Sequence, residues 1–291
     1  MENNLPSPRD VLALARRLQL PDTVLPQLEA VLTPALLAQH QEDVAALTDP
    51  ARAPLAWQPL EQALAPDDPG GMRLLALYLA AACRTRRLYE AAAVPDAVFW
   101  DTMGCFARFL RETRLRCGRF AFDRARWGWR QLACRIFRLG TLEFEYRLLT
   151  NEEPLPPGLT PGQPVLSVHI PSDAQLADGP LAASYAEARR FFSAEGAAFC
   201  ESGAPRVTLC GTWLLAPALR TLLPPSAHIL RFARDYDLYA QKPDSGAFYV
   251  WIFEGKQPPA PLPQNTSLQR AAAAHLAAGG KIGEAWGVKK E

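Results

Sequence analysis

Val165-Leu166-Ser167-Val168-His169-Ile170 begins the stretch of sequence that decides the fold, and this stretch continues to residue 223. The run is rich in β-branched residues and stops at Pro171, which cannot extend a sheet ladder, so it predicts a strand. Residues 181–194 follow Pro180, which suits the first turn of a helix, and carry apolar side chains at helical spacing. We expect a second strand over 206–210 and a second helix over 213–223.

These elements predict a parallel strand pair. Two strands joined by a helix lie parallel with a right-handed crossover, so both strands end at the same edge of the sheet. His169 and Cys210 are therefore expected to emerge side by side at the carboxyl ends of the strands. Open α/β sheets bind ligands at this edge, which makes it the candidate site.

The composition is that of a globular protein with no bulk attraction to a polyanion. The 291 residues are 49% hydrophobic and 21% charged, with a formal net charge of +1. Residues 108–138 hold ten arginines, which we interpret as covering helix faces and pairing with the acidic first seventy residues. Aromatic residues are not interleaved on the same face, so nucleic acid is not an expected partner.

The cysteines and histidines predict neither disulfides nor a metal site. Six cysteines contain no C-x-x-C pair, and four histidines lack zinc-ligand spacing beside them. Met1–Asn4 does not resemble the start of a signal peptide, and no apolar window is long enough to span a bilayer. We therefore expect a cytoplasmic protein with reduced thiols and no membrane partner.

The chain divides by pattern into two expected domains, a helical bundle over 1–120 and a second domain over 121–291. The first contains helical periodicity almost throughout, including long helices over 72–93 and from Pro95 to Leu110. The second is expected to contain a helix over 123–137, strands over 141–149, 165–170 and 206–210, a hairpin of strands over 228–239 and 247–253, and a terminal helix over 267–278.

Three short motifs carry a resemblance to a known family: residues 137–145 (FRLGTLEFE), 168–171 (VHIP) and 210–215 (CGTWLL). Together with the element order, they resemble a bacterial family that joins a helical N-acyltransferase-associated domain to a GNAT-like acyltransferase domain. The resemblance spans most of residues 70–255. It implies an α+β fold in which a helical N-terminal domain precedes a mixed sheet with one central parallel strand pair.

The resemblance also implies acyl-CoA as co-substrate, bound where the parallel strands splay apart. Its pyrophosphate is expected at the start of the intervening helix, near Gly179 and Leu181, with Arg189 and Arg190 two turns further on. Ile170, at the end of the first parallel strand, is expected to face the thioester with its backbone. The helix start departs from the family's usual phosphate loop, because it has a single glycine, followed by Pro180.

Four side chains are catalytic candidates, each with a structural alternative. His169 has the side-chain type that accepts a proton near neutral pH, although it could equally be packed at the sheet edge. Glu143 and Glu145 share one face of their strand and could act as a base through water, or form a solvated face. Cys210 could be a nucleophile with a lowered pKa, although free cysteines are more often buried apolar residues.

Thr212 and Trp213 are candidates for substrate contact. Thr212 also fits the N-cap of the following helix, and Trp213 also fits the core.

These observations leave three hypotheses open. The first is an acyltransferase in which a small-molecule amine or a peptide attacks the thioester directly. The second is a non-catalytic binding or regulatory module that keeps the fold without the cofactor. The third is a thiol enzyme that uses Cys210 and His169.

Overall fold

The computed structural model describes residues 5–290 and divides the chain into two compact units. The helical unit comprises the chain up to Leu139 together with Ser193–Phe199, and the sheet unit comprises Gly140–Phe192 together with the chain from Cys200 onward. Met1–Asn4, on which the signal-peptide prediction depends, lie outside the described residues.

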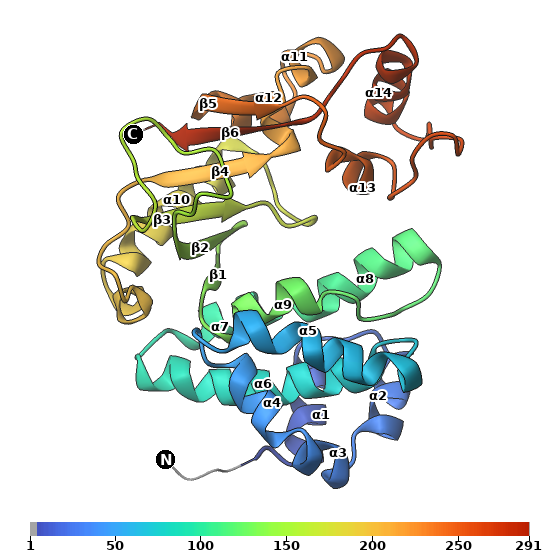
Figure 1. The fold of residues 1–291 in the computed structure, drawn as a ribbon, viewed down its shortest axis with the longest axis vertical. Helices are drawn as coiled ribbons and strands as arrows, with labels where there is room; N and C mark the ends of the chain where they lie inside the picture. Colours follow the sequence, from blue (N-terminus) through green and yellow to red (C-terminus); the bar gives the residue numbers. More distant parts are fainter. Residues whose placement is uncertain (1–4, 291) are drawn as a thin grey trace. The chain divides into compact units, whose positions relative to one another are not determined.

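The helical unit confirms the prediction of a helical N-terminal region (Figure 1). Its elements are α1 (Pro8–Arg17), α2 (Leu25–Val31), α3 (Pro34–Gln39), α4 (Gln41–Leu47), α5 (Ala53–Leu64), the 3-10 turn η1 (Ala65–Asp67), α6 (Met72–Ala91), α7 (Asp96–Met103), α8 (Cys105–Cys117) and α9 (Ala125–Leu132).

Helix α6 is the centre of this unit. It packs against α1, α2, α4, α5 and α9, and its middle turns are buried on all sides. The Tyr78 hydroxyl donates to the carbonyl oxygen of Ala125 at 3.0 Å, and its ring meets that of Phe122 edge-on at 5.1 Å. Gly71 precedes the helix with φ of +67°, and a Cβ there would collide with the carbonyl oxygen of Phe122. Only glycine adopts this positive φ readily and also lacks the Cβ that would collide.

Two helices of this unit are shorter than predicted. The helix expected from Pro95 to Leu110 is interrupted at Gly104, which separates α7 from α8. The helix expected over 123–137 ends at Leu132, because Cys134 adopts a left-handed φ of 55° that an α-helix cannot continue. Ile136–Leu139 then form strand β1.

The sheet has six strands in the order β1-β2-β3-β4-β6-β5, coloured from green to red in Figure 1. The remaining strands are β2 (Leu142–Leu148), β3 (Pro164–His169), β4 (Thr208–Thr212), β5 (Tyr236–Lys242) and β6 (Glu284–Lys289). The neighbours β3 and β4 are parallel, whereas β2–β3, β4–β6 and β5–β6 are antiparallel. The predicted mixed sheet with a central parallel pair is thus confirmed.

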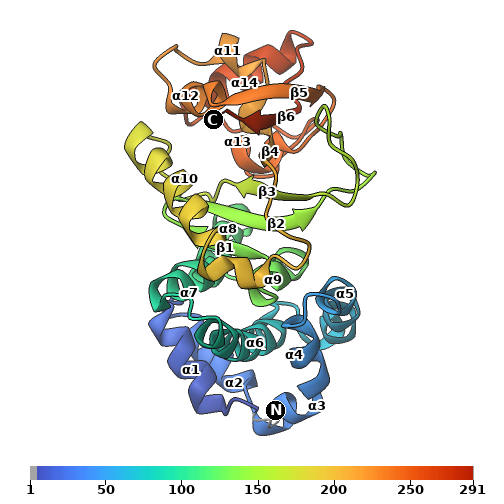
Figure 2. The same cartoon turned by 90° about the vertical axis from the view of Figure 1, so that its left-hand side faces the viewer.

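Helix α10 (Asp178–Phe192) connects the parallel strands and covers one face of the sheet, as Figure 2 shows. Its Tyr185 ring meets that of Phe144 edge-on at 5.9 Å, and its Ser184 hydroxyl accepts from the backbone N–H of Leu142 at 3.1 Å. Because cross-strand partners point to the same face, Phe144 and its partner Val168 mark the face that α10 covers. Glu143, Glu145 and His169 occupy the opposite face.

The predicted C-terminal hairpin is wrong. Residues 228–234 form helix α12 (His228–Arg234), and 248–252 form helix α13 (Phe248–Ile252) rather than a strand. Strand β5 pairs instead with β6, a strand that the sequence pattern did not predict. Aromatic and β-branched residues gave 247–253 the local pattern of a strand. Tertiary packing favours a helix instead, because Phe248, Ile252 and Phe253 join one buried apolar cluster with α14 (Ser267–Ala277).

The second connecting helix is also shorter than predicted. Residues 213–223 form the 3-10 turn η3 (Trp213–Leu215) and the short helix α11 (Leu219–Leu222). After α10, the chain adds the 3-10 turn η2 (Glu195–Phe199) before it enters β4.

Candidate functional site

A row of polar side chains lies on the face of β2 and β3 that is opposite α10. The register places Glu143 opposite His169 and Glu145 opposite Ser167. The Nε2 atom of His169 lies 2.8 Å from Oε2 of Glu145. The His169 side chain is 25% exposed and that of Glu145 is 11% exposed, so the imidazole reaches solvent while its partner does not.

The two glutamates are buried, which differs from the solvated strand face that the sequence left open. Glu143 is 2% exposed and Glu145 is 8% exposed. A buried carboxylate requires a partner, and His169 supplies one for Glu145. In the tautomer that carries its hydrogen on Nε2, His169 donates to the Glu145 carboxylate. The pair therefore has the arrangement of a proton acceptor with an orienting carboxylate.

Arg147 extends the polar row along β2. Its Nε donates to the hydroxyl oxygen of Ser167 at 2.5 Å, and its Nη2 donates to a carboxylate oxygen of Glu153 at 2.6 Å. The pair of the Arg147 guanidinium with the Glu153 carboxylate is bidentate, and such pairs fix both side chains. Arg147 thus ties the loop after β2 to the strand pair that carries His169.

Cys210 lies on the other face of the sheet, away from His169. Its partner across β6 is Gly287, and its thiol is 3.5 Å from the carbonyl oxygen of Val168, on the side that α10 covers. Burial raises the pKa of Cys210, which is opposite to the lowering that the sequence suggested. The two strands therefore end at the same edge, as expected, but they do not bring thiol and imidazole together.

Two tyrosines accompany Cys210 on the covered face. The hydroxyl oxygens of Tyr185 and Tyr236 are 2.6 Å apart, and burial raises the pKa of both phenols. All three groups are thus neutral at ordinary pH.

Strands β3 and β4 pair over a short distance only. Within residues 5–290, their ladder comprises Leu166 with Thr208 and Ser167 with Leu209. Both strands continue beyond this point, to His169 and Thr212 respectively. The ladder between β3 and β4 thus covers fewer residues than either strand contains.

A groove runs along α10 on the covered side. Its volume is about 340 Å³, and residues of α10, α12 and the end of β6 line it. Two predicted cofactor residues, Leu181 and Arg189, line the groove together with Arg231 and Lys289, which the sequence analysis missed. Arg231 pairs with Asp178 at 3.6 Å, and the Lys289 ammonium lies 4.9 Å from the centre of the Tyr185 ring.

The other predicted binding residues lie after β3, on α10 and at the end of β4. Ile170 is half-buried directly after β3, Gly179 is in the first turn of α10, and Arg190 is exposed on the same helix. The Thr212 hydroxyl accepts from the backbone N–H of Leu214 at 3.3 Å, as an N-cap does. Trp213 packs against the buried cluster of α11, α13 and α14, in agreement with the alternative of a core role.

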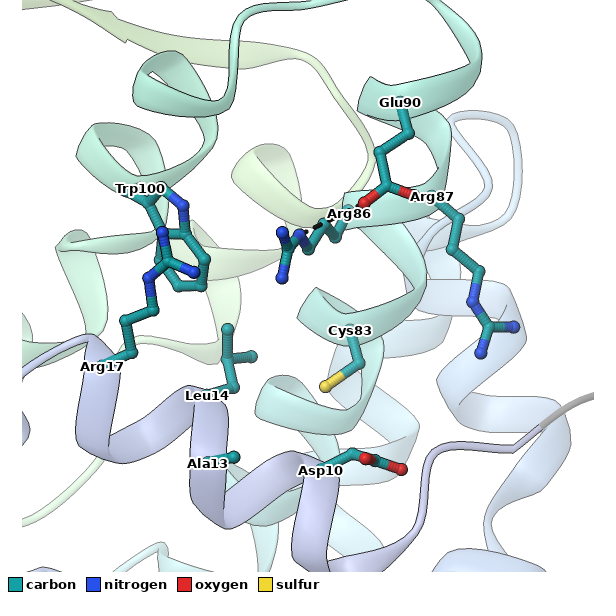
Figure 3. A pocket seen from close by; sticks show the side chains of 9 residues that line it. All are labelled: Asp10, Ala13, Leu14, Arg17, Cys83, Arg86, Arg87, Glu90 and Trp100. Carbon is teal, nitrogen blue, oxygen red and sulfur yellow. Dashed lines mark ion pairs between the residues drawn. The ribbon is translucent and has the colours of Figure 1, made fainter.

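A second cavity, of about 370 Å³, lies in the helical unit between α1, α6 and α7 (Figure 3). Arg17 stacks on the Trp100 ring at 3.6 Å and contacts Asp96 at 3.4 Å. Arg86 pairs with Glu90 at 3.3 Å and with Asp96 at 3.5 Å. Because cations and carboxylates form ion pairs at this cavity, these groups join the three helices.

Between residues 5 and 290, no three His, Cys, Asp or Glu side chains gather closely enough to hold a metal ion. In the same range, no helix has both the length and the apolar character needed to cross a bilayer.

The chain matches two family models in succession. Residues 9–134 match the N-acyltransferase N-terminal domain, and residues 136–289 match the GNAT-like C-terminal domain. A search of curated proteins found no match.

Solved structures give a similarity over nearly the whole chain. One is a crystal structure of an acyltransferase in complex with decanoyl-CoA and teicoplanin, with 26% identity and a TM-score of 0.78 over 99% of this chain and 89% of that one. Another is an acyltransferase in complex with CoA and 10C-teicoplanin, with 25% identity and a TM-score of 0.79 over the same shares. These findings confirm the resemblance drawn from the three motifs: the chain belongs to the N-acyltransferase family whose members join an N-acyltransferase N-terminal domain to a GNAT-like C-terminal domain.

Proposed function

We propose that this protein transfers an acyl group from acyl-CoA to an amine by direct attack, with the His169–Glu145 pair as proton acceptor. The observation that carries the proposal is the strand pair β3–β4, which separates after two ladder positions and ends at His169. A separated parallel pair offers a slot for a thioester and releases backbone N–H groups that can polarise its carbonyl.

The groove along α10 is the proposed binding site for the CoA portion. Arg189, Arg231 and Lys289 line it, and guanidinium and ammonium groups bind phosphate oxygens through charge-assisted hydrogen bonds. In the first turn of α10, the N–H of Leu181 donates to the carbonyl oxygen of Ala177 at 3.1 Å and Pro180 has none, so the proposed backbone donors are Asp178 and Gly179. Asp178 and Asp235 also line the groove, in ion pairs with Arg231 at 3.6 Å and with Lys289 at 3.7 Å, so Arg189 supplies the excess positive charge of the lining. The crystal structures with decanoyl-CoA and CoA, which are similar over nearly the whole chain, support this use of the fold.

The chemistry needs one proton acceptor and no covalent enzyme intermediate. The amine nitrogen attacks the thioester carbonyl carbon, a C–N bond forms, and the C–S bond breaks. The proton of the amine passes to the imidazole of His169, whose charge the buried Glu145 then stabilises. CoA leaves as a thiolate, which is a stable anion near the ordinary thiol pKa of about 8.5. Cys210 has no part in this scheme, because its buried thiol stays protonated.

The acceptor class follows from the face on which His169 lies. The imidazole can take the single proton that a neutral amine loses on acylation, so we propose a primary amine on a small molecule or a peptide-like compound. The complexes of similar acyltransferases with teicoplanin support an acceptor of this kind. The six free cysteines fit a reducing compartment, and we place the reaction in the cytoplasm.

Thermal unfolding with CoA and decanoyl-CoA tests the donor site. A ligand that binds only the folded state adds about 2.7 kcal/mol of stability at a hundredfold excess over its dissociation constant, so the midpoint must rise. Chromatographic detection of acylated amine then tests the transfer. A midpoint shift without acylation of any amine would favour a non-catalytic binding module, and the absence of both would overturn the proposal.

A further inference from the structure

An exposed glycine lies in the middle of the sheet, between two long strands. Gly211 is in β4, which pairs with β3 on one side and β6 on the other, yet the residue is exposed whereas the preceding Cys210 is buried. A glycine inside a strand often marks a place where a ligand or a ring approaches the backbone. Here the indole of Trp286 lies over it, and a Cβ at Gly211 would be 2.6 Å from Cδ1 of that ring.

The strand register places Trp286 on the same face as His169. Ser167 pairs with Leu209, and Gly211 pairs with Trp286. Alternate residues share a face, so His169, Gly211 and Trp286 all lie opposite α10. His169 flanks the point where β3 and β4 separate on one side, and the indole flanks it on the other. The backbone of Gly211 forms the floor between them.

Part of this face is covered by the loop after β2. Val165 and Leu209 pack there against Leu155 and Leu159 of the loop after β2. Near the carboxyl ends of β3 and β4, His169, Gly211 and Trp286 are exposed or half-buried on the same face. These three residues mark the side from which an acceptor can approach the imidazole.

We propose that Trp286 is the wall of the acceptor site and selects amines attached to a ring. This inference depends on the proposed function and adds the shape of the substrate. The indole offers a flat, apolar face that a ring can cover by offset or edge-to-face stacking, whereas a linear chain covers less of it. The reacting amine of the same acceptor would lie at His169, beside the buried Glu143 and Glu145. The indole thus sets the distance between ring and reacting nitrogen.

Steady-state kinetics with decanoyl-CoA as donor test this assignment. The acceptors are 2-phenylethylamine, which has a ring, and n-hexylamine, which has none. Trp286→Ala is expected to raise KM for 2-phenylethylamine about tenfold, to change kcat less than twofold, and to leave n-hexylamine nearly unaffected. Trp286→Phe keeps an aromatic face, so its KM for 2-phenylethylamine is expected to stay within about threefold of that of the natural protein. Trp251→Ala is the matched control, since Trp251 is an exposed tryptophan of α13.

Gly211→Ala gives an independent test of the same geometry. The three atoms nearest to the added Cβ all belong to the Trp286 ring, so the substitution must push the indole aside. It is expected to raise KM for 2-phenylethylamine about as much as Trp286→Ala does. In the Trp286→Ala background, Gly211→Ala is expected to change KM for 2-phenylethylamine less than twofold, because the obstructing ring is gone.

The outcomes separate this inference from the function on which it depends. Equal losses with both amines, or a loss confined to kcat, would overturn the role of Trp286. If no amine is acylated, the proposed function fails, and calorimetric binding of 2-phenylethylamine in the presence of CoA decides the inference by itself. A Kd that Trp286→Ala leaves unchanged would then refute it.

Discussion

The substitution His169→Gln tests the proton-transfer step most directly. Glutamine can still donate a hydrogen bond to Glu145 but cannot accept a proton from the amine. A positioned general base contributes about 10²- to 10⁴-fold to a rate, which corresponds to roughly 2.7 to 5.5 kcal/mol of transition-state stabilisation. We therefore expect the substitution to lower kcat/KM for the amine by about 10²- to 10⁴-fold. The Kd for acyl-CoA should stay unchanged, since the groove along α10 is on the other face.

The stability of the variant separates a chemical effect from a structural one. The backbone pairing of β2 and β3 does not depend on the imidazole. Loss of a good hydrogen bond to the buried carboxylate costs about 1.5–3 kcal/mol, and glutamine retains part of it. The melting midpoint is therefore expected to fall only slightly. His228→Gln on α12 is the matched control for the substitution itself.

The assay is chromatographic separation of CoA and acylated amine, because the exposed thiol of Cys117 would react with a thiol reagent. Glu145→Gln added to His169→Gln is expected to cause no further loss, because the two residues act as a unit. Retention of kcat/KM within threefold in His169→Gln would refute the role of the imidazole.

Three further predictions concern the donor groove, a turn and a buried thiol. Arg189→Ala is expected to raise the Kd for CoA about tenfold in calorimetry at low salt, while a Kd equal to that of the natural protein would remove this residue from the groove. Gly71→Ala is expected to destabilise the protein by more than about 2 kcal/mol in urea unfolding, because strain adds to a backbone collision. Gly118→Ala, with a similar φ and open space, is its control and is expected to lose only about 1 kcal/mol. Burial raises the pKa of Cys134 to about 12, so the unfolded state loses this proton first and stability falls as the pH rises above about 9. Cys134→Ala should flatten that decline, and an unchanged slope would contradict the assignment.

Much of the fold followed from local sequence pattern. The β-branched run that becomes β3, the proline-led helix α10 and the alternating residues of β2 each combine a propensity with a matching periodicity, and the structure confirms all three. Alternation also placed Glu143 and Glu145 on one face. The three motifs indicated the family. In the structure they lie where β1 meets β2, where β3 ends and where β4 ends.

The tertiary structure decided what local pattern could not. Residues 248–252 have the composition of a strand but form a helix, because their apolar side chains complete a cluster with α14. Which face a residue takes at a strand end depends on register, and register separates Cys210 from His169 and brings Trp286 beside Gly211. Burial likewise depends on distant segments, and it keeps the thiol neutral and encloses the glutamates. The sequence by itself thus determined the elements and the residue types at the candidate site. Long-range pairing alone determined which of those residues share a face, because contacts between residues distant along the chain leave no local signal.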